Sequence, residues 1–354
     1  MSRQYSGIEV IEALYKGILG REPDRAGFEN WLERAEDGLD LAAMIRAFVA
    51  SDEHRNKALA IPDKSSVRLP NLIDLYPGKY LRHDEHSSVF HVTDDGEFAF
   101  LEHQIIANRY YDSSDVYSPR IDLDKTVSAA MVIGLGAGNC IELGCFTGPV
   151  LSLLAARNVD VCGVDASHLA FVLAYPNIRG RLRFGDLLDQ DFDRTFDVFL
   201  AMDVLEHLNP VAMDAYVRKI RQITAPDGFA IVNSPMFGED DVFGTVFPQY
   251  IPEWVAAGDT DFWRNIHCDE AGWPVHGHLV NASPQWWEAT FLRHGLVRDR
   301  RIECHLQGLL ADFFRMAPAR KSLFILRRDE WTPDYARIEG ALLDEIGALP
   351  IPQP

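Results

Sequence analysis

The sequence predicts an α/β fold: a doubly wound, mostly parallel seven-stranded sheet with helices on both faces, preceded by a small all-α domain. Residues 139–235 alternate short apolar runs with helical stretches, as a series of β-α-β units does. Residues 1–60 instead carry apolar side chains at helical spacing. The chain has 354 residues, 47% of them hydrophobic, which is enough for a large core and more than one module.

Residues 1–60 are predicted to form a helical interaction module. Apolar stripes run over residues 8–19, 28–35 and 41–49, and Gly20 ends the first of them. The segment G-R-E-P-D-x-x-G, which begins at Gly20, resembles a bacterial helical domain of unknown function that is akin to phycobilisome-linker modules. The resemblance implies a module that binds a protein partner, and it assigns no chemistry.

Two segments connect this module to the predicted sheet. Proline, serine and glycine residues predict a linker over residues 61–80. Residues 81–134 form a lead-in segment, in which the turn Asp94-Asp95-Gly96 predicts a hairpin. Residues 123–133 predict a helix that feeds the first strand of the sheet.

A glycine-bearing turn and a downstream acid predict a site for a nucleoside-bearing cofactor. An apolar strand over residues 139–143 leads into the turn, a helical stretch follows, and a second strand ends at Asp165. Asp165 lies 21 residues beyond Gly144, where a β-α-β unit can hydrogen-bond ribose hydroxyls. The glycine run at 134–138 begins 31 residues before Asp165, which is too far, so we interpret it as a connection into the first strand.

The turn reads E-x-G-x-F-x-G and resembles the first motif of the Rossmann-like S-adenosylmethionine-dependent methyltransferases, with Phe146 in place of the usual middle glycine. Residues 183–186, 203–208 and 225–233 resemble further motifs of that family, in order and at the right distances. The resemblance covers about residues 135–330. It implies S-adenosylmethionine as the cofactor.

The resemblance also implies the residues that bind this cofactor. The carboxylates of Glu142 and Asp165 orient it, and an acid after the third strand meets the adenine amino group. The implied set is Glu142, Gly144, Cys145, Phe146, Gly148, Asp165, Ala166, Gly185, Asp186, Leu187, Met202 and Asp203. Lead-in helices cover the cofactor in many members of the family, so Tyr110 and Tyr111 either pack on it or belong to the core.

The acceptor is predicted to bind after the fifth strand. Residues 236–281 form a long aromatic-rich insertion at the carboxyl end of the sheet, where ligands bind in such folds. We interpret this insertion as an acceptor-binding cap, and a self-packed structural excursion is the alternative. The segment that begins at His278 resembles one in small-molecule and glycan methyltransferases, and Ser283 within it is a helix N-cap.

The rest of the chain is predicted to complete the sheet. Strands are expected near residues 301–306 and 323–327, and residues 331–354 form a C-terminal helix and tail. The basic groups at 298–301 and 327–328 flank these strands, and we interpret them as solvated sheet edges.

Methyl transfer from a sulfonium mainly requires alignment of the acceptor with the S–CH₃ bond. A hydroxyl acceptor also benefits from a general base, and histidine is the natural candidate near neutral pH. We predict His278 as the first choice and His207 as the second. His267, Asp269 and His276 could join His278 around a divalent metal, but without a matching third ligand at a known spacing no metal is predicted.

The composition argues against several other classes. A formal net charge of −19 with diluted basic residues makes a nucleic-acid partner a poor hypothesis. The sequence shows no run of about 18 apolar residues and no leader, so neither a membrane span nor secretion is expected. Five scattered cysteines without a C-x-x-C pair predict reduced thiols in a cytoplasm.

These observations predict an S-adenosylmethionine-dependent methyltransferase that acts on a small molecule or a glycan precursor, with oxygen as the methylated atom. Two alternatives stay open. One is a non-catalytic scaffold with the same fold, which Phe146 in the glycine turn favours. The other is a protein methyltransferase whose target is recruited by residues 1–60.

Overall fold

The computed structural model describes residues 7–19, 22–36, 44, 47–48, 51, 81–83, 85–90, 120–167, 170, 173–246, 264–266, 268, 274 and 277–351. The chain divides into two compact units, Met1–Lys64 and Ser65–Pro354. The predicted linker, the Asp94-Asp95-Gly96 hairpin, and Tyr110 and Tyr111 lie outside the described residues.

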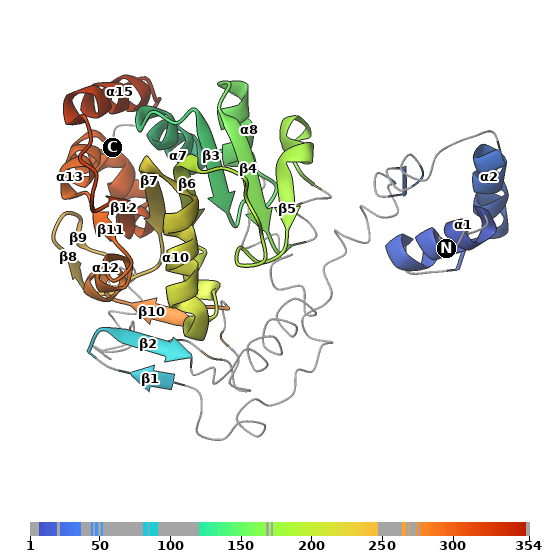
Figure 1. Ribbon diagram of the computed structural model, residues 1–354, viewed down its shortest axis with the longest axis horizontal. Coiled ribbons are helices and arrows are strands. Elements are labelled where there is room, and N and C mark those ends of the chain that lie inside the picture. Colours follow the sequence, from blue (N-terminus) through green and yellow to red (C-terminus); the bar gives the residue numbers. More distant parts are fainter. Residues whose placement is uncertain are drawn as a thin grey trace. The chain divides into compact units, whose positions relative to one another are not determined.

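The first unit contains α1 (Gly7–Leu19) and α2 (Arg25–Glu36), which confirm the first two predicted helices (Figure 1). The buried side chains of Ile11, Leu14 and Tyr15 form a small core with two residues of the third predicted stripe, Met44 and Phe48. Most of the third stripe lies outside the described residues.

The G-R-E-P-D-x-x-G segment forms the start of α2 and its contact with α1. The Asp24 carboxylate accepts a hydrogen bond from the backbone N–H of Gly27 at 2.9 Å, which caps the start of α2. A Cβ atom at Gly27 would lie 2.1 Å from the hydroxyl of Tyr15, so a larger residue would separate the two helices.

The second unit is built on a seven-stranded sheet with the order β11-β12-β7-β6-β3-β4-β5 (Figure 1). Neighbouring strands are parallel except where β12 pairs with β7 and with β11. The central strands are nearly continuous buried apolar runs, as expected for a sheet that is covered on both faces. The predicted fold class is confirmed. The strands are β3 (Asn139–Leu143), β4 (Asp160–Asp165), β5 (Leu182–Phe184), β6 (Phe196–Met202), β7 (Thr224–Asn233), β11 (Leu296–Arg298) and β12 (Leu323–Arg328).

The strand order reverses between β3 and β6. From β3 the chain passes through α8 (Pro149–Ala156) to β4, and from β6 it passes through α10 (Met213–Ile223) to β7 on the other side of β3. Because parallel crossovers are right-handed, α8 and α10 cover opposite faces of the sheet. Such a reversal opens a crevice for ligands at the carboxyl ends of the strands.

The remaining helices complete the two outer layers. The predicted lead-in helix is confirmed as α7 (Leu123–Gly134), which packs against α8 and against the C-terminal α15 (Tyr335–Gly347). Ser283 caps α12 (Pro284–Leu292) as predicted, because its side chain accepts from the backbone N–H of Trp286. The other segments are α13 (Arg300–Leu309), α14 (Ala311–Met316), η3 (Pro176–Arg181), η4 (Leu205–His207), η5 (Pro210–Ala212) and η7 (Pro318–Lys321).

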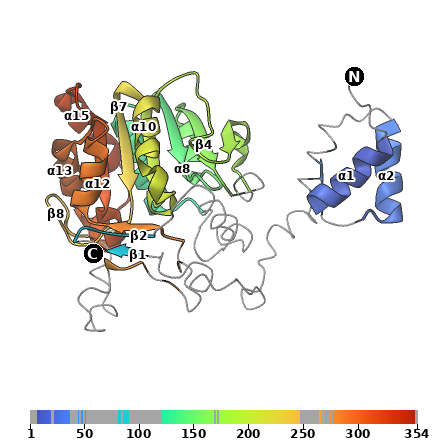
Figure 2. The same ribbon diagram turned by 60° about the horizontal axis from the view of Figure 1, so that its bottom comes forward.

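A small antiparallel sheet lies beyond the carboxyl ends of the parallel strands, as Figures 1 and 2 show. It consists of β1 (Leu81–His83), β2 (Ser87–Phe90) and β10 (Val280–Ala282), in the order β1-β2-β10. A second pair, β8 (Glu239–Asp240) and β9 (Gly244–Thr245), follows β7. The lead-in segment and the end of the predicted cap are therefore joined in one sheet.

The strand predicted at residues 301–306 is wrong, because these residues lie in α13. The Asp299 side chain caps this helix by accepting from the backbone N–H of Ile302, and Ile302 and Leu306 are both fully buried on one helical face. Leu296–Arg298 supplies the edge strand instead. The strand predicted at 323–327 is confirmed as β12.

The interpretation of Arg298 as a solvated edge residue is also wrong. Its side chain is 1% exposed, and its guanidinium donates to Asp240 at 2.6 and 2.9 Å and to Glu303 at 2.6 Å. Burial lowers the ability of such a group to stay charged, and the charge of Asp240 and the acceptor oxygens of Glu303 compensate for the lost water. This buried ion cluster ties β8 and α13 to the edge of the main sheet.

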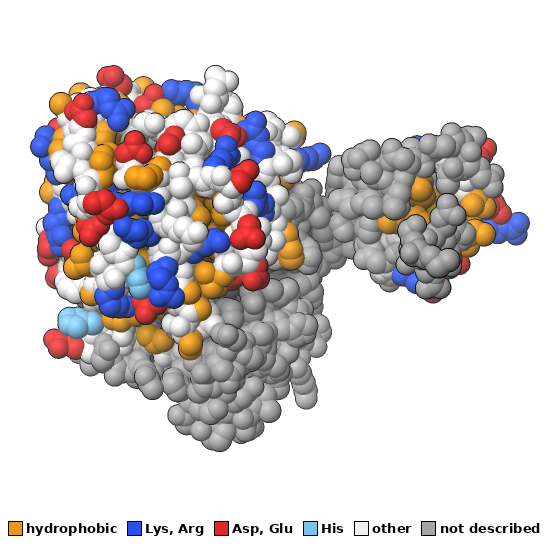
Figure 3. Space-filling view, viewed as in Figure 1, with side chains coloured by type: hydrophobic (Ala, Val, Ile, Leu, Met, Phe, Trp, Pro, Cys, Tyr) orange, Lys and Arg blue, Asp and Glu red, His pale blue; other side chains and the backbone are white. Residues whose placement is uncertain are grey.

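The surface and the cysteines give little indication of location. Figure 3 shows Lys and Arg side chains interspersed with Asp and Glu on the described part of the face that it draws. Among the described residues, each helix is too short or too polar to cross a lipid bilayer. None of the five cysteines, all of which lie among the described residues, forms a disulfide, and Cys140, Cys145 and Cys162 are buried in the sheet region.

Candidate active site

The turn between β3 and α8 is held in an unusual backbone conformation. Gly144, Phe146 and Gly148 have φ angles of 68°, 45° and 74°, all in the left-handed region that favours glycine. A Cβ atom at Gly144 would lie 2.3 Å from Cγ2 of Val204, and one at Gly148 would lie 2.1 Å from Cδ1 of Ile178. Both glycines are therefore required by close packing, and Phe146 adopts its conformation against its own preference.

The Asp165 carboxylate holds this turn from the end of β4. One oxygen accepts a hydrogen bond from the backbone N–H of Phe146 at 2.7 Å, and the other accepts from the N–H of Ser167 at 2.7 Å. A carboxylate has about four acceptor positions, so lone pairs remain for the hydroxyls of a ribose. The aspartate that was predicted to bind the ribose thus also fixes the backbone of Phe146.

Glu142 lies on β3, one strand away from Asp165. Its side chain is buried, and its Oε2 atom is without a hydrogen-bond partner within the part of the chain that the structure describes. Burial, and then the negative charge of Asp165, raise the pKa of Glu142 well above its usual value. An unsatisfied buried oxygen is costly unless a ligand completes it, so Glu142 can accept a hydrogen bond from a bound cofactor.

Asp186 follows β5, and its carboxylate is already engaged. One oxygen accepts from the backbone N–H of Leu188 at 2.6 Å, and the other accepts from the hydroxyl of Tyr216 on α10. Gly185 before it has a φ angle of 115°. The implied contact of Asp186 with an adenine would add to these two hydrogen bonds. Nothing in the sequence indicated that Tyr216 would reach this aspartate.

The other implied cofactor residues differ in their surroundings. Cys145 and Leu187 are buried side chains beside the turn and after β5. Met202 lines a small cavity beneath the end of β6. Asp203 has a φ angle of 56° and forms an ion pair with Arg320 at 2.6 Å, which leaves its carboxylate less available to a ligand. Ala166 is partly exposed after β4.

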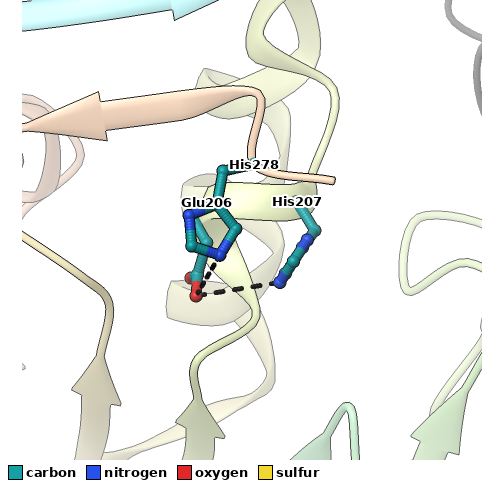
Figure 4. Close-up of side chains that lie close together, drawn as sticks. All are labelled: Glu206, His207 and His278. Atoms are coloured by element: carbon teal, nitrogen blue, oxygen red, sulfur yellow. Dashed lines mark ion pairs between the residues drawn. The ribbon is translucent and has the colours of Figure 1, made fainter. Parts of the chain in front are cut away.

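The two predicted catalytic histidines meet at the carboxyl end of β6, around a glutamate (Figure 4). Glu206 is fully buried in η4, and its Oε1 atom lies 3.8 Å from Nε2 of His207 and 4.0 Å from Nε2 of His278. The two imidazole rings are 4.8 Å apart and nearly perpendicular. We call Glu206, His207 and His278 the Glu-His-His cluster.

Hydrogen bonds fix each part of the Glu-His-His cluster. Oε2 of Glu206 accepts from the hydroxyl of Ser234 at 2.9 Å, whereas Oε1 has no hydrogen-bond partner among the described residues. Nδ1 of His207 lies 3.1 Å from the carbonyl oxygen of Gly277. The carbonyl of Glu206 accepts from the backbone N–H of Leu279 at 2.6 Å, which brings the segment before β10 onto η4.

The cluster and the cofactor turn are neighbours. Val204, whose side chain leaves no room for a Cβ atom at Gly144, lies two residues before Glu206. Burial, and then the charge of Asp203, raise the pKa of the Glu206 carboxyl well above its usual value. An acid directly before His207 was visible in the sequence, but its burial against a histidine 72 positions later was not. His267, Asp269 and His276 lie outside the described residues.

Family models match two parts of the chain. The model described as a methyltransferase domain matches residues 118–290, and the one described as a domain of unknown function (DUF4214) matches residues 2–58. Residues 118–290, just under half of the chain, therefore match a methyltransferase domain, which is an enzyme domain. The likeness of the N-terminal module to phycobilisome linkers is not supported by this match. No curated protein matches the chain.

Several solved structures of methyltransferases are similar to this chain. The 1,6-didemethyltoxoflavin N1-methyltransferase of Burkholderia thailandensis is 15% identical with a TM-score of 0.43, and the match covers 71% of this chain and 99% of that chain. The amino pentose methyltransferase of calicheamicin biosynthesis from Micromonospora echinaspora is 25% identical with a TM-score of 0.29, and the match covers 37% and 55%. The mitomycin 7-O-methyltransferase is 15% identical with a TM-score of 0.38, and the match covers 57% and 55%.

These matches span only about half the length of the amino pentose and mitomycin enzymes. At such TM-scores they carry no information about the acceptor of this chain.

Proposed function

We propose that this protein transfers the methyl group of S-adenosylmethionine to a hydroxyl oxygen of a small molecule or a glycan precursor. The observation that supports this proposal most is the Glu-His-His cluster, which combines a buried carboxylate with two imidazoles beside the cofactor turn. Three titratable groups at the carboxyl end of a strand next to the switch point suit the activation of an acceptor.

In this proposal the cofactor lies across the ends of β3 and β4. Glu142 and Asp165 accept hydrogen bonds from it, and the two turn glycines let the backbone approach it closely. Asp186 contributes at the adenine end, and Cys145, Leu187 and Met202 supply apolar walls. The sulfonium methyl group then points toward the end of β6.

The reaction is a displacement at the methyl carbon. The acceptor oxygen forms a bond to this carbon as the C–S bond breaks and its electron pair returns to sulfur. Alignment of the two bonds can supply up to about 7–11 kcal/mol. The hydroxyl proton must also leave, and in this proposal a neutral imidazole of His278, or failing that of His207, accepts it, which contributes roughly 10²–10⁴ in rate.

Binding and turnover of the full chain test the proposal. Calorimetric titration with S-adenosylmethionine should show micromolar binding, and mass spectrometry of metabolites and glycans from cells with and without the gene should reveal a product heavier by one methylene group. Binding without any methylated product would favour a different role for the domain.

A scaffold function is the second candidate, because the left-handed Phe146 departs from the glycine pattern of the cofactor turn. Under that hypothesis the bulky ring replaces the cofactor, and the N-terminal unit supplies the activity by binding a partner. The same titration separates the two functions, since a scaffold would show no heat of cofactor binding. A protein methyltransferase would instead label a protein band when supplied with radioactive cofactor and a cell extract.

A further inference from the structure

We propose that Glu206, His207 and His278 are the ligands of a divalent transition-metal ion, and that this ion binds the acceptor hydroxyl. The part that concerns the acceptor rests on the proposed methyl transfer, whereas the binding of the ion does not. Nothing in the sequence pattern alone predicted this ligand set, because the third ligand lies in a different segment of the chain.

The geometry brings one donor atom of each residue to a common point. Oε1 of Glu206 lies 3.8 and 4.0 Å from Nε2 of His207 and His278, and one ligand atom from each of the three residues lies within 4.8 Å of the other two (Figure 4). Around a tetrahedral zinc ion with bonds of about 2.0–2.1 Å, ligand atoms are separated by roughly 3.3 Å. The separations of 3.8 and 4.0 Å therefore require a contraction of roughly half an ångström, and the separation between the two histidine atoms, which is at most 4.8 Å, requires up to about 1.5 Å; rotations of the two partly exposed imidazoles can provide both.

The surrounding hydrogen bonds leave these donor atoms oriented for an ion. The Gly277 carbonyl can only accept, so Nδ1 of His207 carries the proton and a neutral ring presents the lone pair of Nε2. Ser234 donates to Oε2 of Glu206, which leaves Oε1 directed at the histidines. Ligands of metal ions are held in this way by a second layer of hydrogen bonds.

The buried carboxylate of Glu206 would be stabilised by a positively charged partner. Glu206 has no exposed surface, and its Oε1 atom has no hydrogen bond to compensate for the loss of water. A cation bound between Oε1 and the two imidazoles satisfies this oxygen. A protonated histidine could do so as well, and that occupant is the alternative outcome of the experiment below.

The ligand types indicate the class of ion. Two imidazoles and one carboxylate suit zinc, iron, manganese, cobalt or nickel, whereas magnesium and calcium favour sites made of oxygen alone. Three protein ligands leave at least one coordination position open, as in catalytic rather than structural metal sites. That position can take the oxygen of the acceptor hydroxyl.

The ion would then replace a histidine as the activator of the acceptor. A hydroxyl bound to a divalent ion loses its proton to solvent more readily. The resulting alkoxide oxygen forms the O–CH₃ bond, the C–S electron pair returns to sulfur, and S-adenosylhomocysteine leaves as a neutral thioether. One proton is released for each methyl group transferred.

Metal binding by the full chain tests the inference without any acceptor. The protein is stripped with a chelator and titrated calorimetrically with Zn²⁺, Mn²⁺ and Co²⁺, and the visible absorption of bound Co²⁺ is recorded. We expect one ion per chain, with affinity reduced more than tenfold in His278→Ala, His207→Ala and Glu206→Gln. The affinity of Ser234→Ala for the ion should fall by roughly 10–100-fold, because this variant removes a hydrogen bond that supports the ligand Glu206.

His294→Ala is the matched control. His294 also faces a carboxylate, with Nε2 at 2.9 Å from Asp214, but the described residues around it supply no second imidazole. Its affinity for the ion should equal that of the wild type. Circular dichroism verifies that Glu206→Gln remains folded. If Glu206→Gln does not fold, His278→Ala tests the site independently, because the His278 side chain is partly exposed.

The outcomes are distinguishable from those of the proposed function. Equal affinity for the ion in the wild type and in His278→Ala, or no stoichiometric binding by the wild type, would overturn the inference and leave the histidines as a proton-accepting pair. Cofactor binding is measured separately on the same stripped protein. An ion that binds to a chain unable to bind S-adenosylmethionine would uphold the metal site and refute the methyltransferase.

Discussion

Replacement of Asp165 by Asn removes the negative charge from the end of β4 at nearly constant size. In the wild type the carboxylate accepts from the N–H groups of Phe146 and Ser167, both at 2.7 Å. The carboxamide of Asn has only one acceptor oxygen, so one of these N–H groups loses its partner. The ribose of the cofactor also loses a charged acceptor.

The expected loss follows from these contacts. A hydrogen bond to a charged group contributes about 1.5–3 kcal/mol, so the weakened ribose contact alone raises the dissociation constant of S-adenosylmethionine by roughly 10–150-fold. The left-handed Phe146 no longer has its anchor, which adds to the loss. Asp165→Ala removes both acceptors and should abolish measurable binding while the fold persists.

Isothermal titration with S-adenosylmethionine measures this effect, with circular dichroism as the check of folding. The matched control is Asp160→Asn at the opposite end of the same strand, where the exposed carboxylate pairs with Arg181 and Arg194. That variant should bind the cofactor as the wild type does. A dissociation constant for Asp165→Asn within threefold of the wild type would refute the assigned role of Asp165.

Three further predictions concern the turn and the buried ion cluster. Gly144→Ala should destabilise the protein by about 2–4 kcal/mol in urea unfolding, because Gly144 has a positive φ and the added Cβ atom would overlap Val204. A change below about 0.5 kcal/mol would contradict the packing argument. The control is Gly308→Ala, in which the added methyl group has no atom near it. Phe146→Gly should bind S-adenosylmethionine at least as tightly as the wild type in the same titration, because glycine adopts the left-handed conformation without strain; a tenfold loss would show that the ring contributes to the site. Burial raises the pKa of Glu303 to about 8, above its value of about 4.3 in the unfolded chain. The folded state therefore holds the Glu303 proton more tightly than the unfolded state does. The stability that this proton contributes is lost as the pH rises from the unfolded to the folded pKa. The free energy of unfolding of the wild type relative to Glu303→Gln should therefore fall by up to about 1.4 kcal/mol per pH unit between about pH 5 and pH 8; a difference independent of pH would show that Glu303 is charged throughout.

The central strands of the sheet could be predicted from the sequence, because their positions follow from residues that are near one another in the chain. The buried apolar runs of β3, β4 and β6 are bounded by turns, and the helix cap Ser283 is visible three residues before its partner. The same local reasoning placed Asp165 at the end of β4, beside the glycine turn. These features depend on residues that are near one another in the chain.

One set of local signals was overlooked, and features that depend on distant residues escaped prediction. The strand assigned to residues 301–306 overlooked Asp299 as an N-cap and the helical spacing of Ile302 and Leu306, which were local signals. The burial of Arg298 could not be foreseen, because its partner Asp240 lies 58 positions away. Glu206 is a similar case, since only the fold brings His278 to it.

A crystal structure of the full chain with S-adenosylhomocysteine is the most direct test of the account. It should show the ribose hydroxyls at Asp165 and the thioether sulfur directed toward Glu206, His207 and His278. A ligand bound elsewhere, or a crevice filled by the ring of Phe146 at saturating ligand, would contradict the assigned cofactor site.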